Sequence, residues 1–460
     1  MSVTATNVAA RLGTAIGAAQ VHGNAELCGQ YAVDAVVPAA VAAPTCAAEV
    51  AEIVQFAKSE KLALIPCGKR TKLNIGMPPA RYDVAVDMTG LNQIAYYDPA
   101  DLTLSVEAGL GLVQLADILR RQNQFVPMAV PFFDECTVGG TVASGIGSTL
   151  RPGYGSARDF LLGAEFVNGT GALTKSGGRV VKNVTGYDLH KLLIGSLGTL
   201  GIITRLNFRT FPVPQSSGHF AVTFSTVEAI LRFRAVVAKS PLTLSLFEIF
   251  GPEAAQRLAE SSRGDEATAP SWFAPGLWHI FVAFEGTEAI LRRYSFDLIE
   301  FAQQTGASNC NLLDEAVGKV LSQGLREFLK ALSSASAATV FKISVLPALP
   351  ADVLHLRAIA ERHSIPCSLF GSNSGPLYFS VVPPILDAAT IAALAQVSSG
   401  VFEFAAAHNG QASILFSPTE LKRGVNVWGS AKQDAELMRR VKNAFDPHNI
   451  FAPGRFVADI

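Results

Sequence analysis

The chain has few charged residues and almost no net charge. Of its 460 residues 16% are charged, and 37 Lys and Arg residues oppose 38 Asp and Glu residues, a net charge of −1. Binding to nucleic acid depends on clustered Lys and Arg, so the composition predicts no nucleic-acid partner. Because an average globular protein has about 25% charged residues, we expect a surface short of charge and partly covered by a partner chain.

Long apolar runs and a secretion signal are also missing. No stretch approaches the roughly 18–20 uninterrupted apolar residues that span a bilayer, so we expect no transmembrane segment. Met1 to Gln20 carries Arg11 in its middle and has no positive region followed by a compact apolar one. The expected location is cytoplasmic, with any contact to the inner membrane made through partner subunits.

The sequence lacks the usual signatures of metal sites and disulfides. Its six cysteines are scattered, without a CxxC pair or zinc spacing, which predicts reduced thiols. His355 and His363 lie eight residues apart and no HExxH occurs, so no metal is expected.

Nucleotide and hydrolase motifs are incomplete. The runs that begin at Gly109 and Gly145 lack the third glycine of a Rossmann fingerprint, and Gly68-Lys69 lacks the rest of a P-loop. Ser196 does not have the flanking glycine spacing of a nucleophile elbow. NAD(P)-Rossmann binding, ATP hydrolysis and serine-hydrolase chemistry are therefore unsupported.

What is present is a large apolar fraction, 49%, in alternating periods. Such a chain can bury large cores, and its length predicts about two or three domains. Helical spacing alternates with strand-like runs from Thr45 to Phe211, the pattern of an α/β region, and Thr45 is placed to cap the first such helix. We expect helices over 47–62, 111–121, 226–238, 288–305, 317–332 and 431–445, and strands over 63–66, 83–88, 102–108, 279–284 and 340–346.

Two segments suit close approach to a ligand. The loop from Pro66 to Lys72 follows a strand, carries three cations and a hydroxyl, and offers a run of backbone N–H groups suited to a pyrophosphate. Glycines cluster among small residues between Val130 and Gly155, where backbone can approach another group closely. A helix start packed on a sheet would explain the second segment as well.

The stretch from Pro131 to Pro212 resembles the FAD-binding (PCMH-type) domain of the vanillyl-alcohol-oxidase family, most of all that of the FAD-binding subunit of bacterial glycolate oxidases. The motifs that carry the resemblance are Gly139-Gly140, Gly155-Ser-Ala-Arg-Asp-Phe160, Lys182-Asn-Val-Thr-Gly-Tyr-Asp-Leu189, Gly195 to Gly201, and the ending Phe445-Asp-Pro-His-Asn-Ile-Phe-Ala-Pro-Gly-Arg455.

The resemblance implies an α+β fold in three parts. Residues 1–213 would form the two-subdomain FAD-binding domain, 214–425 an inserted α/β cap or substrate domain, and 426–460 a tail that returns to the FAD domain. It also implies a set of cofactor-binding positions. These are Cys67, Gly68, Lys69, Arg70, Thr71, Lys72, Pro131, Thr137, Val138, Gly139, Gly140, Ser144, Gly147, Gly155, Asp159, Gly201, Ile202 and Ile203.

Two departures from the family pattern concern the cofactor. Relatives are richer in glycine where this chain has Lys69 and Arg70, so either the loop differs in shape or it exchanges φ > 0 freedom for charge on the phosphates. Covalent relatives attach the flavin through a histidine in or near this loop, and none is present here. With only Cys67 and Cys136 as nearby nucleophiles, we expect non-covalent FAD.

The resemblance implies a 2-hydroxy-acid dehydrogenase that takes glycolate or D-lactate and passes electrons from FAD to partner flavoprotein and iron–sulfur subunits. Catalytic relatives carry a His-rich metal motif, of which only His408 is left here. His408, Arg423 and Arg455 are candidates for contact with an anionic substrate. Two alternatives stay open: a self-sufficient FAD-linked oxidase of another hydroxy acid or alcohol, and a non-catalytic flavin-binding scaffold subunit.

Overall fold

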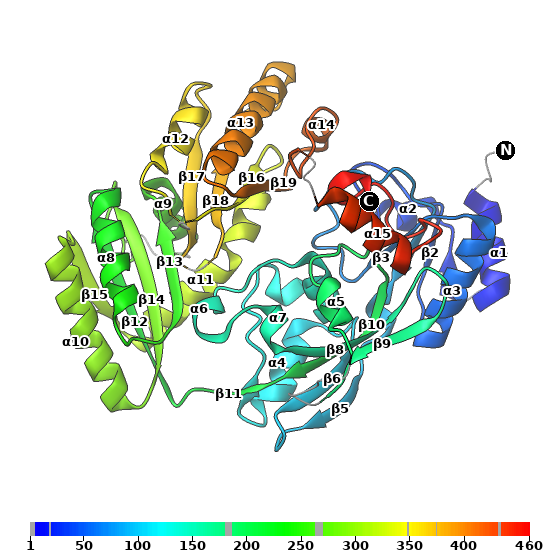
Figure 1. The fold of residues 1–460 in the computed structure, drawn as a ribbon, viewed down its shortest axis with the longest axis horizontal. Helices are drawn as coiled ribbons and strands as arrows, with labels where there is room; N and C mark the ends of the chain where they lie inside the picture. The colour runs from blue at the N-terminus through cyan, green and yellow to red at the C-terminus, as the bar shows by residue number, and fades with distance from the viewer. Residues whose placement is uncertain are drawn as a thin grey trace.

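The computed structural model describes residues 5–17, 20–179, 186–262, 270–346, 349–373, 375–430 and 434–460. The chain forms mixed helices and sheets in two main bodies, with its tail folded back on the first (Figure 1). The part of the Lys182 to Leu189 motif that precedes Gly186 lies outside the described residues.

The N-terminal half holds two sheets. The first has the order β1-β2-β4-β3, with strands Val21–His22, Ala40–Ala42, Val84–Asp87 and Leu64–Cys67. The second has the order β5-β6-β10-β8-β9, with strands Ile94–Asp98, Thr103–Glu107, Ile202–Arg209, Leu161–Val167 and Leu173–Gly177. β7 (Gln124–Phe125) pairs with β11 (Phe211–Pro212).

Helices pack on these sheets or connect them. They are α1 (Ala5–Ile16), α2 (Ala25–Gly29), α3 (Ala47–Glu60), α4 (Leu112–Arg120), α5 (Val138–Ser144), α6 (Arg151–Tyr154) and α7 (Ala157–Phe160). The apolar side chains of α3 at helical spacing, Val50, Ile53 and Val54, are fully buried against the first sheet.

The prediction that Thr45 caps the N-terminus of helix α3 is wrong. Cys46, not Thr45, is the N-cap residue, and its side chain makes no capping hydrogen bond. Thr45 lies one residue further out and donates its N–H to Glu49 Oε2 at 2.6 Å. A carboxylate in the first turn thus reaches back over the helix start.

The region from β12 to β19, here called the cap, is one large sheet with helices on both faces. Its order is β15-β12-β14-β13-β17-β18-β16-β19, with strands Asn309–Leu313, Ser216–Phe224, Trp278–Gly286, Leu244–Phe250, Cys367–Ser372, Leu377–Val381, Thr339–Ser344 and Gln411–Phe416. One face is covered by α8 (Val227–Lys239), α10 (Glu288–Thr305), α12 (Leu354–Glu361) and α13 (Ala388–Ala407). The other carries α9 (Pro252–Ser262) and α11 (Glu315–Ser333).

Among the described residues, α13 alone is long and apolar enough to span a membrane by length and composition. It packs on α12 and on strands β16 and β19, and Leu394, Val397 and Val401 are buried in the cap core. A core helix of a soluble protein meets the same test, so the helix is weak evidence for a membrane span.

The C-terminal tail returns to the N-terminal half, as the resemblance implied. α14 (Thr419–Lys422) leads to α15 (Ala435–Phe445), whose predicted first residues, 431–433, lie outside the described part. After α15 the chain extends the first sheet, because Leu64 N–H donates to Ile450 at 2.7 Å and Ala452 N–H donates to Leu64 at 2.8 Å. Asp446 and Lys442 form a buried ion pair at 2.6 Å beneath this junction.

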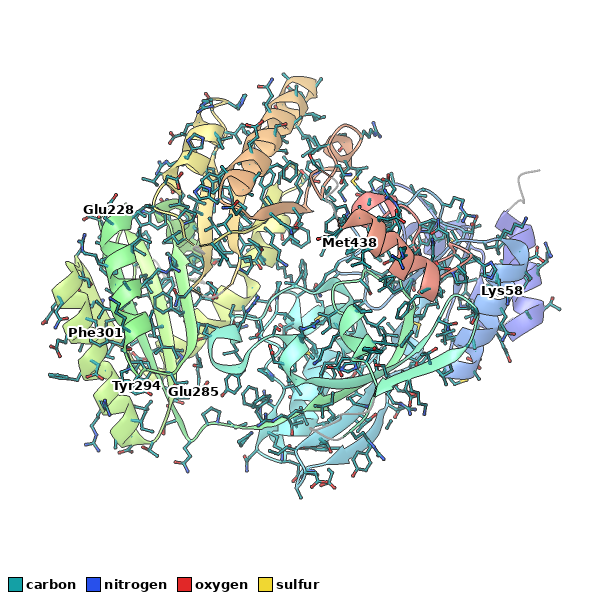
Figure 2. All side chains as sticks on the ribbon, viewed as in Figure 1. Lys58, Glu228, Glu285, Tyr294, Phe301 and Met438 are labelled. Carbon is teal, nitrogen blue, oxygen red and sulfur yellow. The ribbon has the colours of Figure 1, made fainter. Side chains whose placement is uncertain are left out.

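The cap contacts the N-terminal half at several places, and two of these contacts involve Glu327 and Tyr154. On α11, Glu327 accepts the N–H groups of Phe132 and Phe133 at 2.9 and 3.3 Å. On α6, Tyr154 donates its hydroxyl to Glu285 at the end of β14, a residue that Figure 2 places where the cap sheet meets the other half. Both contacts flank the residues between Phe132 and Tyr154, where the glycines cluster.

Candidate functional site: a glycine-lined pocket beside the loop after β3

The loop after β3 lies directly against the start of α5. Gly68 makes this approach possible, because a Cβ there would stand 2.2 Å from Thr137 Oγ1. Thr137 is itself buried and caps α5 by accepting the Gly140 N–H at 3.2 Å. Any side chain at position 68 would therefore separate the loop from the helix.

The loop presents unpaired backbone donors. Within the described part of the chain, no acceptor is found for the N–H groups of residues 68–72, and the next donor, Leu73, bonds to Arg70. Backbone N–H groups ordinarily find a partner, and a consecutive run of free ones forms an anion-binding concavity. The loop thus provides the donors that the sequence predicted for a pyrophosphate.

Arg70 resolves the question of the missing glycines. Its φ is +63°, so the loop keeps the left-handed turn without a glycine. The guanidinium lies 4.5 Å from the centre of the Tyr31 ring, and Tyr31 donates its hydroxyl to the buried Asp87 at 2.6 Å. The Tyr31 ring is held by its own hydrogen bond, and its contact with the Arg70 guanidinium stabilises Arg70 in this left-handed conformation.

The start of α5 forms the opposite wall but offers fewer donors. Val138 and Gly139 give their N–H groups to Leu110 and Ala108, at 2.9 and 2.8 Å. Gly139 has no room for a side chain, because a Cβ would stand 2.7 Å from that of Ala108. Its glycine is thus explained by packing, whereas Gly140 faces the pocket.

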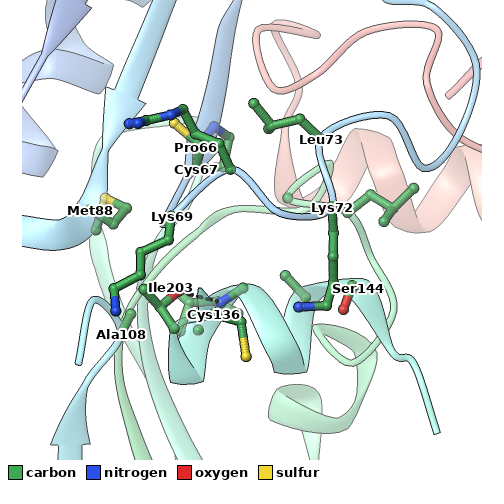
Figure 3. A pocket seen from close by; sticks show the side chains of 18 of the residues that line it. Pro66, Cys67, Lys69, Lys72, Leu73, Met88, Ala108, Cys136, Ser144 and Ile203 are labelled. Carbon is green, nitrogen blue, oxygen red and sulfur yellow. Dashed lines mark hydrogen bonds between the residues drawn. The ribbon is translucent and has the colours of Figure 1, made fainter. Parts of the chain in front are cut away.

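Between these walls lies an open pocket, with about 750 Å³ of space that includes its opening to solvent. Figure 3 shows Lys69 crossing it toward Ala108 and the Lys72 amine pointing toward Ser144. Burial lowers the pKa of the Lys72 ammonium, and nearby Cys136 and Glu327 raise it. Two cations therefore stand at the same opening as the free N–H groups.

The pocket contains thiols but no histidine in its lining. Cys67 is buried with its Sγ 3.6 Å from the Val86 carbonyl oxygen, and burial raises the pKa of its thiol. Cys136 is also buried. A protonated, buried thiol is a poor nucleophile.

Arg455 of the C-terminal tail lines the pocket, but its guanidinium is already hydrogen-bonded to backbone carbonyls. Its guanidinium donates to the carbonyls of Leu73 and Ile75, and burial lowers its pKa to about 10. Its own carbonyl accepts from Met77 N–H at 3.0 Å. Arg455 therefore ties the tail to the loop and positions it.

The structure brings most predicted cofactor residues to this pocket. Its lining includes Cys67, Gly68, Lys69, Arg70, Thr71, Lys72, Thr137, Gly139, Gly140, Ser144, Gly201 and Ile203. Pro131 and Gly147 line a second cavity nearby instead. Val138 and Ile202 lie in the core, and Asp159 caps α7 by accepting the Ser156 N–H at 2.7 Å, beside Gly155. Cofactor contact stays a prediction for all of the residues predicted to bind it.

His408 and Arg423 are not part of either cavity. His408 ends α13, where its ring bonds to the Phe404 carbonyl at 2.8 Å and to Asp352 at 2.9 Å. Arg423 is exposed after α14. Among the described residues no group of three or more His, Cys, Asp or Glu could hold a metal ion.

Sequence reasoning missed several residues around the site. Tyr31 and Asp87, which support Arg70, come from distant segments, so their spacing carried no signal. Glu248, in the second cavity, did carry one: it is the single charged residue of strand β13, whose other residues are apolar except for Ser245. A charged residue is almost never fully buried unless it is paired with another group.

Family models match both halves of the chain. A model described as FAD binding domain matches residues 38–177, and one described as FAD linked oxidases, C-terminal domain matches residues 213–456. The second covers more than half of the chain, so the chain belongs to the FAD-linked oxidases. It is an FAD-dependent oxidoreductase, and the cations of the pocket and the N–H groups of residues 68–72, which have no acceptor among the described residues, fit that cofactor.

Individual relatives agree with this family. The chain is 25% identical over 428 residues to the D-2-hydroxyglutarate dehydrogenase of Xanthomonas citri pv. viticola, covering 91% of this chain and 89% of that one. It is 36% identical over 180 residues to the glycolate oxidase subunit GlcE of Escherichia coli, covering 39% and 51%. The solved 4-ethylphenol oxidase from Gulosibacter chungangensis superposes with a TM-score of 0.76 at 15% identity, covering 99% and 97%, which shows the PCMH-type fold.

Proposed function

We propose that this chain is the FAD-binding subunit of a 2-hydroxy-acid dehydrogenase of the glycolate-oxidase type. It would oxidise the CH–OH group of glycolate, D-lactate or a related acid. The observation that carries the proposal is the run of free N–H groups at residues 68–72 on a pocket beside two lysines. The likeness to GlcE and to a D-2-hydroxyglutarate dehydrogenase supports the substrate class.

In this proposal the N–H groups of the loop and the Lys69 and Lys72 ammonium groups bind the pyrophosphate of FAD. The small residues of α5 let the cofactor lie close to the backbone. When bound, FAD supplies the acceptor for the hydrogen and electron pair of the substrate carbon. The tail, residues 426–460, holds the loop in place through Arg455, and residues 1–213 and 214–425 form the two domains.

FAD is expected to be dissociable. Among the described residues the pocket lining holds no histidine and its thiols are buried, so we expect neither residue type to form a covalent bond with the flavin. Acid or heat denaturation of the yellow protein should release all of the flavin into solution. Flavin fluorescence that stays on the protein band in a denaturing gel would contradict this, and Cys67→Ser and Cys136→Ser would then identify the link.

A partner subunit is expected to take the electrons. The low share of charged residues supports a surface that is partly covered in a cytoplasmic complex. Co-expression with flavoprotein and iron–sulfur subunits encoded nearby should yield one complex by size-exclusion chromatography, and reduced holoprotein should pass electrons to it. Reoxidation at equal rates with and without those subunits would contradict the subunit role.

A self-sufficient dehydrogenase is the second candidate. The observation that favours it is the cavity around Glu248, because it gives this chain a place for substrate. An absorption spectrum of the purified chain, followed by anaerobic addition of glycolate and D-lactate, separates the two. Bleaching of the flavin band without a partner supports direct oxidation by this chain, and a colourless protein that cannot be reconstituted with FAD overturns the cofactor assignment.

A further inference from the structure

A second cavity lies between the cap and the N-terminal half, with an empty volume of about 500 Å³. The loop around Gly147 and the start of α6 form one wall. The cap sheet and α11 form the other, held there by Glu327 and by the close approach of Gly153, where a Cβ would stand 2.9 Å from Ser245 Cα. The chain passes from Ser144, which lines the FAD pocket, to Gly147, which lines this second cavity.

Glu248 lines this cavity as an isolated carboxyl. It is 7% exposed, and its strand neighbours on the same face, Leu246 and Phe250, belong to the apolar core. No hydrogen bond or ion pair to its side chain is found among the described residues. Burial raises its pKa to about 8. A buried carboxyl without a partner costs stability, so its presence needs a reason other than folding.

Tyr378 stands across from it on β18. A Cβ at Gly147 would stand 3.9 Å from the Tyr378 hydroxyl, so the phenol of the cap lies close to the Gly147 loop of the N-terminal half. Burial raises its pKa, the Glu248 charge raises it further, and Arg151 lowers it. The phenol therefore lies within the field of both charges.

Arg151 provides the positive end of the cavity. Its side chain makes no ion pair within the described residues, and it lies more than 4 Å from the Glu248 carboxylate, since no salt bridge joins them. The other cation, Arg326, already pairs with Glu327 at 2.9 Å and lies over the Phe133 ring. A backbone hydrogen bond lowers the pKa of the Asp159 carboxyl and the Arg151 charge lowers it further, but no ion pair joins the two side chains among the described residues. Arg151 is therefore the cation of this cavity that can pair with an anion.

A wide groove leads to Arg151 from outside. Arg151, Gly375 and Pro376 line both the cavity and this groove, and Arg234 and Lys342 add two more cations. Met438 of α15 lies on the opposite rim (Figure 2). A positive approach of this kind concentrates anionic molecules near the entrance.

We propose that this cavity is a substrate chamber of this chain, in which Arg151 binds the carboxylate of a 2-hydroxy acid and Glu248 accepts the proton of its hydroxyl. The inference rests on the proposed function. The O–H proton passes to the Glu248 carboxylate, the oxygen lone pair forms the new C=O bond, and the α-hydrogen leaves with its electron pair to oxidised FAD. The products are a 2-keto acid, reduced flavin and a protonated Glu248.

The proposal predicts opposite effects of pH on binding and on turnover. Glu248 is neutral below about pH 8 and becomes a carboxylate above it. The carboxylate repels a bound anion, so oxalate affinity should fall as pH rises through 8, while the oxidation rate should increase. The titratable and charged groups beside Glu248 in the cavity are Arg151 on α6, Arg326 on α11 and Tyr378 on β18. Lys342 on β16 pairs with Tyr378 across the strands, and burial, with the nearby Arg151 charge, lowers the pKa of its ammonium group.

The test uses the FAD-loaded protein and oxalate as an unreactive probe, followed by calorimetry and by perturbation of the flavin absorption band. Wild-type protein should bind oxalate more weakly at pH 9 than at pH 7, and Glu248→Gln should remove this dependence. Arg151→Gln should weaken oxalate roughly 10–100-fold at both pH values, because a charge-assisted contact is lost. Glu260→Gln on α9 and Arg292→Gln on α10 are surface controls that should match wild type.

Anaerobic flavin reduction by glycolate, D-lactate and D-2-hydroxyglutarate supplies the second readout. Glu248→Gln should reduce the rate about 10²–10⁴-fold with FAD content unchanged. If Glu248→Gln keeps both the wild-type rate and the pH dependence of oxalate binding, the chamber is overturned while the FAD assignment stands. Failure to bind FAD at all would instead overturn the proposed function, and FAD-loaded protein that binds none of the four acids would overturn the chamber.

Discussion

Gly68→Ala should weaken the binding of FAD while leaving most of the fold intact. The added Cβ would stand 2.2 Å from Thr137 Oγ1 and 2.9 Å from its Cγ2. Thr137 is 2% exposed and caps α5, so it has little room to move. Overpacking of this kind costs about 1–3 kcal/mol, which corresponds to roughly 5–150-fold weaker FAD binding if the loop alone shifts.

Flavin fluorescence titration of the apoprotein measures this loss. Gly424→Ala is the matched control, because no atom lies within 4 Å of a Cβ there and its φ is not positive. The double variant Gly68→Ala with Thr137→Ala removes the clashing atoms and should regain part of the affinity. Equal FAD affinity of Gly68→Ala and Gly424→Ala would show that the loop does not need to touch α5 to bind the cofactor.

Lys422→Met should produce the largest loss of stability. Lys422 donates to both Asp34 oxygens, at 2.8 and 2.9 Å, and to the Asn74 carbonyl at 2.5 Å. Both side chains of the pair are 1% exposed. Removing one partner leaves a buried charge, so the free energy of unfolding should fall by about 3–5 kcal/mol.

Urea denaturation checks this value. The control is Lys319→Met, which breaks the exposed pair with Glu315 on α11 and should cost roughly 0.3–0.5 kcal/mol. Asp34 has a φ of +48°, which Asn tolerates, so the double variant Asp34→Asn with Lys422→Met should recover much of the loss. If the two lysine variants lose equal stability, the buried pair does not join the tail region to the N-terminal half.

Local patterns predicted the long periodic elements well. The helix expected over 288–305 matches the bounds of α10, and the strand expected over 83–88 contains β4. Helical and strand periods depend on neighbours within a few residues, which the sequence contains directly. The N-cap of α3 was mispredicted because the carboxylate of Glu49, in the first turn, accepts the N–H and the hydroxyl of Thr45 and so engages the side chain that was expected to cap the helix.

The predicted cofactor residues also include some whose place could be recognised from local sequence and others whose local role only the structure showed. The loop from Cys67 to Lys72 follows a strand, and its cations and backbone donors could be recognised from the sequence. Gly155 and Asp159 also belong to a family motif, and in the structure Asp159 forms a local capping box on α7 with Ser156, next to Gly155. A motif records which residues recur together, and it does not distinguish those that contact a ligand from those that shape the turn beside it.

By itself the sequence determined the class of fold, through composition and periodicity. The family and FAD followed from the resemblance of its contiguous motifs to a known family, and the loop after β3 was predicted to hold the cofactor from its cations and backbone donors. The tertiary structure alone decided how Arg70 keeps a left-handed turn, that Arg455 positions the loop, and that His408 lies away from both cavities. It also placed Glu248, Tyr378 and Arg151 around one cavity. These residues are more than 90 positions apart in the chain, and only the docking of the cap on the N-terminal half brings their charges into a common, water-poor space.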